Sequence, residues 1–150
     1  MRIALCSDEP YPVHATVRRW LEERGHEVVP FGAVASGAET AWAPLAEEAA
    51  EAVASGRCDE GVFFCWTGTG ISMAANKVAG IRAALCSDPG QVAAARVWNH
   101  ANVLCLSNRT MADDMAREML AAWFDTDPGD RGAEGVAALA AVDARHRRPG

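Results

Sequence analysis

Cys65 stands at the end of an apolar run and is followed by a glycine-rich loop at residues 67–72. Gly68 and Gly70 leave room for backbone N–H groups to approach a ligand closely. A helix is expected to follow the loop, and the first N–H groups of a helix are free to bind an anion. Such a positive potential favours the thiolate of a nearby cysteine, which is a base or a nucleophile. The pattern therefore indicates anion binding beside a reactive thiol, although a tight strand-to-helix turn with a buried thiol fits the same residues.

This loop does not match the common nucleotide-binding motifs. It lacks the Gly-Lys-Ser/Thr of a P-loop and the third glycine of a dinucleotide fingerprint. A dinucleotide-binding module is therefore disfavoured.

Polar residues also follow three other apolar runs, namely Ser7, Asp8 and Glu9, then Ser87 and Asp88, then Ser107, Asn108 and Arg109. Trp98, Asn99 and His100 lie just before the last of these runs. In parallel α/β sheets, ligands bind beyond the carboxyl ends of the strands, near a switch point. The residues that follow the strands are therefore the candidates for chemistry.

The elements that would hold these residues alternate between strand and helix five times. Apolar runs predict strands over 2–7, 26–31, 61–65, 82–86 and 103–106. Helical spacing predicts helices over 12–24, 42–55, 72–78, 89–98 and 110–124, with a loop over 33–40. This alternation predicts an α/β fold in three layers, with a five-stranded parallel sheet between helices. We expect a single domain over 1–150, in which 125–150 form a C-terminal extension with a helix over 134–145.

The composition limits the classes of partner. The chain has 150 residues and a formal net charge of −6, which argues against a nucleic-acid or anionic-membrane surface. No apolar run approaches the ~20 residues of a membrane span, and no signal peptide is visible. The five cysteines form no Cys-x-x-Cys pair and no zinc-finger spacing with histidine. We therefore expect a reduced, cytoplasmic protein without a metal.

Several segments together resemble the type B ribose-5-phosphate isomerases and the galactose-6-phosphate isomerase subunits. The segments are 65–77 (CWTGTGISMAANK), 78–86 (VAGIRAALC), 99–106 (NHANVLCL), Ser7-Asp8 and 25–28 (GHEV). The resemblance covers about residues 1–125 in order and spacing, and its motifs are specific enough to exclude chance.

The resemblance implies a Rossmann-like three-layer α/β/α sandwich that forms a homodimer or tetramer, with the active site at the subunit interface. It implies an aldose-ketose isomerase of carbohydrate metabolism that works through a cis-enediolate, without metal or cofactor. Cys65 resembles the base, and Thr67 the hydroxyl that assists at the ring or carbonyl oxygen. The predicted substrate-binding residues are Asp8, Glu9, Trp66, Gly68, Thr69, Gly70, Ile71, Ser72, Trp98, Asn99, His100 and Arg109.

Within this set, the resemblance gives some residues an expected contact. The amides of residues 68–72 resemble the enediolate's anion hole, Asp8 and Asn99 resemble ligands of substrate hydroxyls, and Arg109 resembles a phosphate ligand. His100 is a candidate substitute for the family's ring-opening histidine, although a structural hydrogen bond is the alternative.

The chain departs from the family at positions that face the substrate. Glu9 and Trp98 stand where the family has histidines, and Trp66 stands where it has glycine. Glu134 and Gly135 stand where the family has a C-terminal pair of arginines. Together these changes remove cations and add aromatic surface, so we expect a substrate other than ribose 5-phosphate, including one without a phosphate. The alternative is that Arg145, Arg147 or Arg148 supplies the charge.

A second function remains open, namely a non-catalytic sugar-binding protein or a partner subunit of a two-chain isomerase. The intact segment 65–68 favours an enzyme, whereas Trp98 in place of the ring-opening histidine favours the partner subunit or an open-chain substrate.

Overall fold

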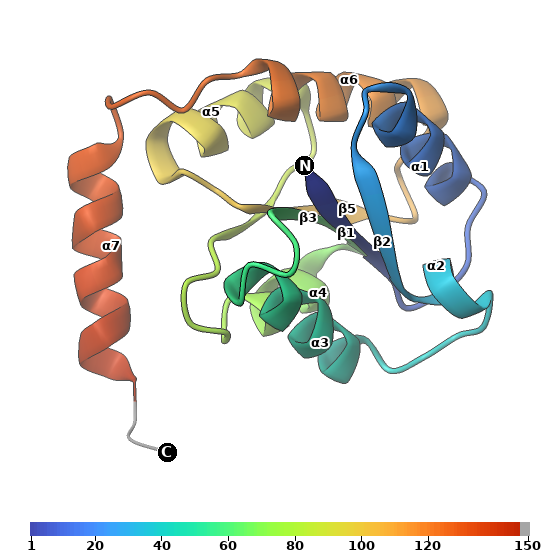
Figure 1. Ribbon diagram of the computed structural model, residues 1–150, viewed down its shortest axis with the longest axis horizontal. Helices are drawn as coiled ribbons and strands as arrows, with labels where there is room; N and C mark the ends of the chain where they lie inside the picture. The colour runs from blue at the N-terminus through green and yellow to red at the C-terminus, as the bar shows by residue number, and fades with distance from the viewer. Residues whose placement is uncertain (148–150) are drawn as a thin grey trace.

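The computed structural model describes residues 1–147. Its strands are β1 (Arg2–Ser7), β2 (Glu27–Gly32), β3 (Glu60–Cys65), β4 (Ala83–Leu85) and β5 (Val103–Ser107). Its helices are α1 (Val13–Glu23), α2 (Ala33–Ser36), α3 (Trp42–Ala54), α4 (Thr69–Ala75), α5 (Pro89–Asn99), α6 (Asp113–Asp125) and α7 (Ala133–His146). The strands form one parallel sheet in the order β2-β1-β3-β5-β4, which confirms the predicted α/β fold (Figure 1).

The central strands are apolar on both faces because helices cover both. Successive side chains of a strand point to opposite faces. Ile3 and Leu5 therefore join the core beneath α1, α5 and α6. Ala4 and Cys6 join a second core beneath α3 and α4. Figure 1 shows the sheet between these two layers of helices, as the continuous apolar runs predict.

Some predicted boundaries were wrong by a few residues. The segment 33–40 was predicted as loop, but Ala33–Ser36 forms the single turn α2, which ends where Gly37 takes a left-handed conformation with φ 73°. Helix α4 begins at Thr69 instead of residue 72, and α6 begins at Asp113 instead of residue 110. Single turns and helix starts carry too few residues to show a periodic pattern.

The sheet order creates a switch point between β1 and β3. After β1 the chain enters α1 on one face, and after β3 it enters α4 on the other. In the register, Ser7 pairs with Phe64, and Cys65 pairs with Ser107. The carboxyl ends of β1, β3 and β5 therefore lie side by side, where ligands bind in sheets of this kind.

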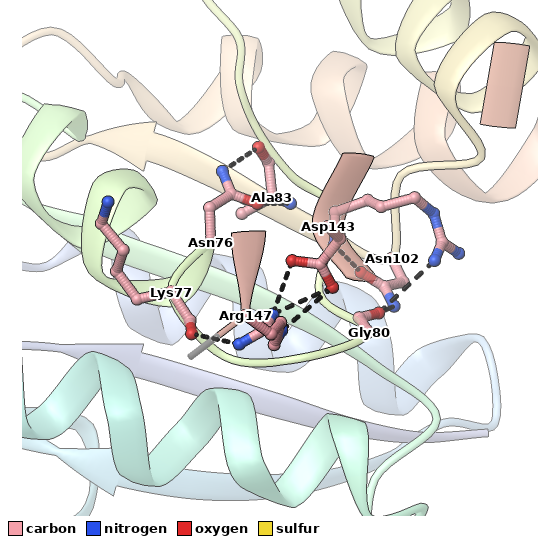
Figure 2. A network of polar contacts seen from close by, with 8 residues as sticks. Asn76, Lys77, Gly80, Ala83, Asn102, Asp143 and Arg147 are labelled. Atoms are coloured by element: carbon pink, nitrogen blue, oxygen red, sulfur yellow. Dashed lines mark hydrogen bonds and ion pairs between the residues drawn. The ribbon is translucent and has the colours of Figure 1, made fainter. Parts of the chain in front are cut away.

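Helix α7 packs against α5, and none of its residues is buried. Its far end is tied to the loop before β4, because the Arg147 guanidinium donates to the Lys77 carbonyl at 3.0 Å and pairs with Asp143 at 2.8 Å (Figure 2). A cavity of about 500 Å³ lies between α7 and the β4 edge of the sheet. Across residues 1–147, no helix has the length and apolar character needed to cross a membrane.

Candidate active site

Cys65 and the loop after it occupy the carboxyl end of β3. Cys65 is buried, and its carbonyl accepts a hydrogen bond from the Asn108 N–H at 2.9 Å. Gly68 takes a left-handed conformation with φ 77°, and a Cβ on it would lie 2.6 Å from Leu85 Cδ1. Only glycine fits this position, so the turn that directs the chain from Cys65 into α4 depends on Gly68.

The loop after β3 is also fixed by β5. The Arg109 N–H and the Ser107 hydroxyl both donate to the Trp66 carbonyl, at 3.1 Å and 2.9 Å. Thr67 and Arg109 line a shared depression of about 340 Å³. The Thr67 and Thr69 hydroxyls are hydrogen-bonded to each other at 2.7 Å. The structure thus brings Thr67 and Arg109, two predicted site residues, to one hollow beside the glycine loop.

Asp8 lies at the end of β1, next to the end of β3. Its side chain is 8% exposed, and within residues 1–147 no group hydrogen-bonds its Oδ1. Burial raises the pKa of Asp8, and the neighbouring Glu9 carboxylate raises it further. A buried carboxylate oxygen without a partner is costly, so this atom is available to a ligand hydroxyl.

Glu9 and Trp66 are joined through Tyr11. The Tyr11 hydroxyl donates to Glu9 Oε2 at 2.8 Å, and its ring stacks on the Trp66 ring with centroids 5.9 Å apart. Trp66 is nevertheless 50% exposed. Hydrogen bonding and stacking fix the direction of the Glu9 carboxylate and form an aromatic wall beside the glycine loop. Tyr11 was not among the predicted site residues, because a single tyrosine in a loop carries no motif.

Three predicted site residues lie at the opposite end of the sheet from Cys65, namely Trp98, Asn99 and His100. Helix α5 runs back along the sheet, so its end lies at the amino ends of the strands. Next to it, the Asn102 carbonyl accepts from the Gly61 N–H at the start of β3, and the His100 carbonyl accepts from Arg82 Nε. A single chain therefore does not bring these three residues to Cys65.

The side chains at this amino end have their own contacts. The Arg131 guanidinium lies 4.9 Å from the centroid of the Trp98 ring. Asn99 lines the cavity beneath α7. The Nε2 atom of His100 is buried and has no hydrogen-bond partner within residues 1–147.

His14 carries no motif and was not among the predicted site residues, and it is buried near the site. Its Nε2 lies 2.8 Å from Asn108 Oδ1. The signal in the sequence was its position on the apolar face of α1, three and seven residues before Val17 and Leu21. Over residues 1–147, no three His, Cys, Asp or Glu side chains are gathered closely enough to hold a metal ion.

Comparison with known proteins identifies relatives over most of the chain. The family model described as Ribose/Galactose Isomerase matches residues 3–139. Ribose-5-phosphate isomerase B of Escherichia coli is 40% identical over 126 residues, which cover 83% of this chain and 84% of that protein. D-erythrulose-4-phosphate isomerase of Pectobacterium atrosepticum is 33% identical over 112 residues, covering 75% of this chain and 74% of that protein.

A solved structure matches the fold as well as the sequence. Ribose-5-phosphate isomerase B of Clostridium thermocellum superposes with a TM-score of 0.88 and 34% identity. The match covers 98% of this chain and 100% of that one.

Proposed function

The chain belongs to the ribose/galactose isomerase family, and on that premise we propose that it is an aldose-ketose isomerase acting on a sugar phosphate. The observation that carries the proposal is the pairing of Cys65 with Asp8. These residues directly follow Phe64 and Ser7, which are partners in the β1–β3 register. A thiol before a glycine loop therefore lies beside a buried carboxylate with an unpartnered oxygen.

In the proposed reaction, the Cys65 thiolate removes the proton from C2 of the aldose. The electrons of the C–H bond form the C1–C2 double bond of a cis-enediolate, and the carbonyl oxygen gains the negative charge. The backbone N–H groups of residues 68–72 stabilise that charge, since donors fixed in advance are effective where charge develops. The Cys65 thiol then returns the proton to C1, and a second proton passes between the two oxygens. One carbon is oxidised as its neighbour is reduced, so the reaction as proposed uses no external oxidant, metal or cofactor.

The remaining residues orient the substrate. We assign the phosphate to the hollow shared by Arg109 and Thr67, because a guanidinium binds phosphate through paired hydrogen bonds. Asp8 and Glu9 then face the hydroxyl end, where carboxylates accept hydrogen bonds without repelling the phosphate. Trp66 and Tyr11 form the wall between them.

We propose a short, open-chain sugar phosphate as the substrate. Trp98 stands where the family has its ring-opening histidine, and within residues 1–147 no other histidine is placed to replace it, since His14 is bonded to Asn108 and the Nε2 atom of His100 is buried. A four-carbon sugar with its phosphate on O4 lacks the hydroxyl that closes a five-membered ring, so it needs no acid for ring opening. One relative, the D-erythrulose-4-phosphate isomerase of Pectobacterium atrosepticum, is named for a four-carbon sugar phosphate of this class.

A second copy of the chain would complete the site. Trp98, Asn99 and His100 lie far from Cys65 of their own chain, and α7 leaves an apolar cavity at the same end. A homodimer in which the end of α5 from one copy meets the glycine loop of the other explains both observations. The five unpaired cysteines fit a reducing compartment such as the cytoplasm.

Proton exchange at C2 in D2O tests the proposed chemistry directly. NMR should detect deuterium uptake by at least one tetrose, pentose or hexose phosphate, and C65A should lose it by at least about 100-fold. C58A is the matched control, because Cys58 is also a buried thiol but lies before β3 at the opposite end of the sheet. Equal activity in C65A and C58A would contradict the role of Cys65. No uptake from any sugar would favour a partner subunit or a binding protein.

A further inference from the structure

A closed series of hydrogen bonds underlies the loop that holds Asp8 and Glu9. Tyr11 N–H approaches His14 Nδ1 at 3.4 Å, which leaves Nε2 as the protonated nitrogen. Nε2–H donates to Asn108 Oδ1 at 2.8 Å, and Asn108 Nδ2 donates to Ser7 Oγ at 3.0 Å. The Ser7 hydroxyl donates to the Glu9 carbonyl at 2.7 Å. The series thus begins and ends in the loop after β1.

We call His14, Asn108 and Ser7 the His14 relay. All three side chains are buried, with exposures of 6%, 7% and 0%. They come from α1, the end of β5 and the end of β1, so the relay links three elements beneath the site. The hydrogen bonds of the relay all run in the same direction. Reversing the donor and acceptor of any one bond would leave a buried donor facing another donor.

The relay is connected to the reacting residue through the backbone of Asn108. The Asn108 N–H donates to the Cys65 carbonyl at 2.9 Å, while its side chain holds Ser7. The next residue, Arg109, binds the Trp66 carbonyl in the same way. Asn108 therefore fixes the distance between the loop after β1 and the loop after β3.

We propose that His14 and Asn108 are positioning residues, which hold Asp8, Glu9 and Tyr11 in register with Cys65 for the isomerase reaction proposed above. None of the relay groups touches the reacting carbons in this assignment. They act by keeping two loops in one arrangement. A shift of about 1 Å at a catalytic group can cost ~100-fold in rate, so such positioning has a measurable effect.

Protonation of His14 would open the series. A proton on Nδ1 would face the Tyr11 N–H, and the two donors would repel each other. The groups that contact His14 are the rings of Phe64 and Tyr11, with centroids 4.8 Å and 6.2 Å away, and the Asn108 amide. Asp8 and Glu9 are the acidic residues of the loop, and the Glu9 carboxylate is bound by the Tyr11 hydroxyl.

The fold favours neutral His14, because burial lowers its pKa from the ordinary 6.5. The unfolded chain therefore takes up this proton first as the pH falls. The contribution of His14 to folding stability is complete above pH 6.5 and declines as the pH falls below that value. The geometry of the site and the stability of the fold should change together over this acidic range.

Four variants, one of them a control, separate positioning from simple packing. H14Q keeps an N–H donor near the place of Nε2 and does not titrate, whereas H14F keeps the ring shape without polar atoms. H26Q is the matched control, because burial also lowers the pKa of His26 but that ring packs on Phe124, away from the site. We expect H14F and N108A to lose roughly 10- to 100-fold in kcat/KM at neutral pH, and H14Q to stay near the wild-type value.

The indole N–H signal of Trp66, assigned with W66F, gives a readout that needs no activity. In the wild type and in H26Q we expect it to shift with pH as His14 titrates, and in H14Q we expect that step to be absent. A step that persists in H14Q would overturn the proposal. So would wild-type kcat/KM in folded H14F and N108A with only a lower melting temperature. If the wild-type protein isomerises no sugar, the proposed function fails, and the Trp66 titration still tests the relay.

Discussion

Gly68 shows how a single residue controls the candidate site. Its φ of 77° is costly for any residue with a Cβ, and the space around it is closed by Leu85 and by the backbone of Leu106 at 3.1 Å. The residue must therefore satisfy two separate demands, one of conformation and one of packing. Both follow from the sharp turn between Cys65 and α4.

Replacing Gly68 with alanine should reveal both demands. We expect G68A to lose more than the ~1–2 kcal/mol of a left-handed alanine, because the new methyl group also collides with Leu85. G25A is the matched control: Gly25 has φ 81°, but nothing lies within 4 Å of its added Cβ. Denaturant unfolding of both variants measures the difference. Equal losses of stability would show that the loop moves aside without cost.

The sequence predicted which residues end the strands, but not how they contact one another. Glu9 and Trp66 were predicted separately as substrate-binding residues. Tyr11 bonds to one and stacks on the other, and this contact depends on the β1–β3 pairing. Similarly, Asn108 and His14 are 94 residues apart, so no local pattern could join them. Contacts between distant residues require the sheet order, which the sequence left open.

At the scale of the elements, the sequence predicted more. Continuous apolar runs at residues 2–7, 61–65 and 103–106 predicted buried parallel strands, because a strand covered on both faces needs no polar alternation. The order of those strands was not encoded in the same way. β5 lies between β3 and β4 although it follows both in the chain. For the same reason, the sequence did not show that Trp98–His100 lie at the opposite end of the sheet from Cys65.

Glu60, the first residue of β3, contacts two helices. Its carboxylate pairs with Arg96 of α5 at 2.9 Å and accepts from the Trp123 indole of α6 at 2.6 Å. The Arg96 guanidinium also lies 4.4 Å from the Trp123 ring centroid. The side chains of Arg96 and Glu60 are only 12% and 13% exposed. If one of them is removed, water therefore cannot readily solvate the charge of the other.

Removing Glu60 should destabilise the fold without changing the chemistry. We expect E60A to lose about 3 kcal/mol in denaturant unfolding, because it leaves a buried guanidinium without its carboxylate partner and an indole N–H without its acceptor. E22A, which removes an exposed pair with Arg18 on α1, should lose no more than about 0.5 kcal/mol. C2 exchange by folded E60A should match the wild type, since Glu60 contacts Arg96 and Trp123 and none of the residues assigned to the reaction. Similar losses of stability in E60A and E22A would contradict the assignment.

At the scale of the whole molecule, the predicted site residues are divided between the two ends of the sheet. Asp8 and Cys65 lie at the carboxyl ends of the strands, and Asn99 lies at the amino ends beside the cavity under α7. In α7, Leu139 is 46% exposed and Val142 is 43% exposed. Exposed apolar side chains that gather along one helix are typical of an interface. A symmetric dimer would cover these residues and bring Asn99 of each copy to the other site.

Complementation between inactive variants tests this arrangement. C65A and N99A should each be inactive alone, because each removes one half of every shared site. When the two are co-expressed, a mixed dimer has one site with both Cys65 and Asn99 intact, so the mixture should recover about a quarter of wild-type C2 exchange.

The matched control is C65A co-expressed with D8A. Both changes fall in the half of the site that one chain supplies, so every mixed dimer carries a defect at each site and activity should stay absent. Recovery with D8A as a partner would mean that Asp8 and Cys65 act from different chains. Failure of N99A to complement C65A, in dimers shown to be mixed by mass spectrometry, would mean that each chain works alone. Wild-type activity of N99A on its own would mean that Asn99 has no part in the reaction.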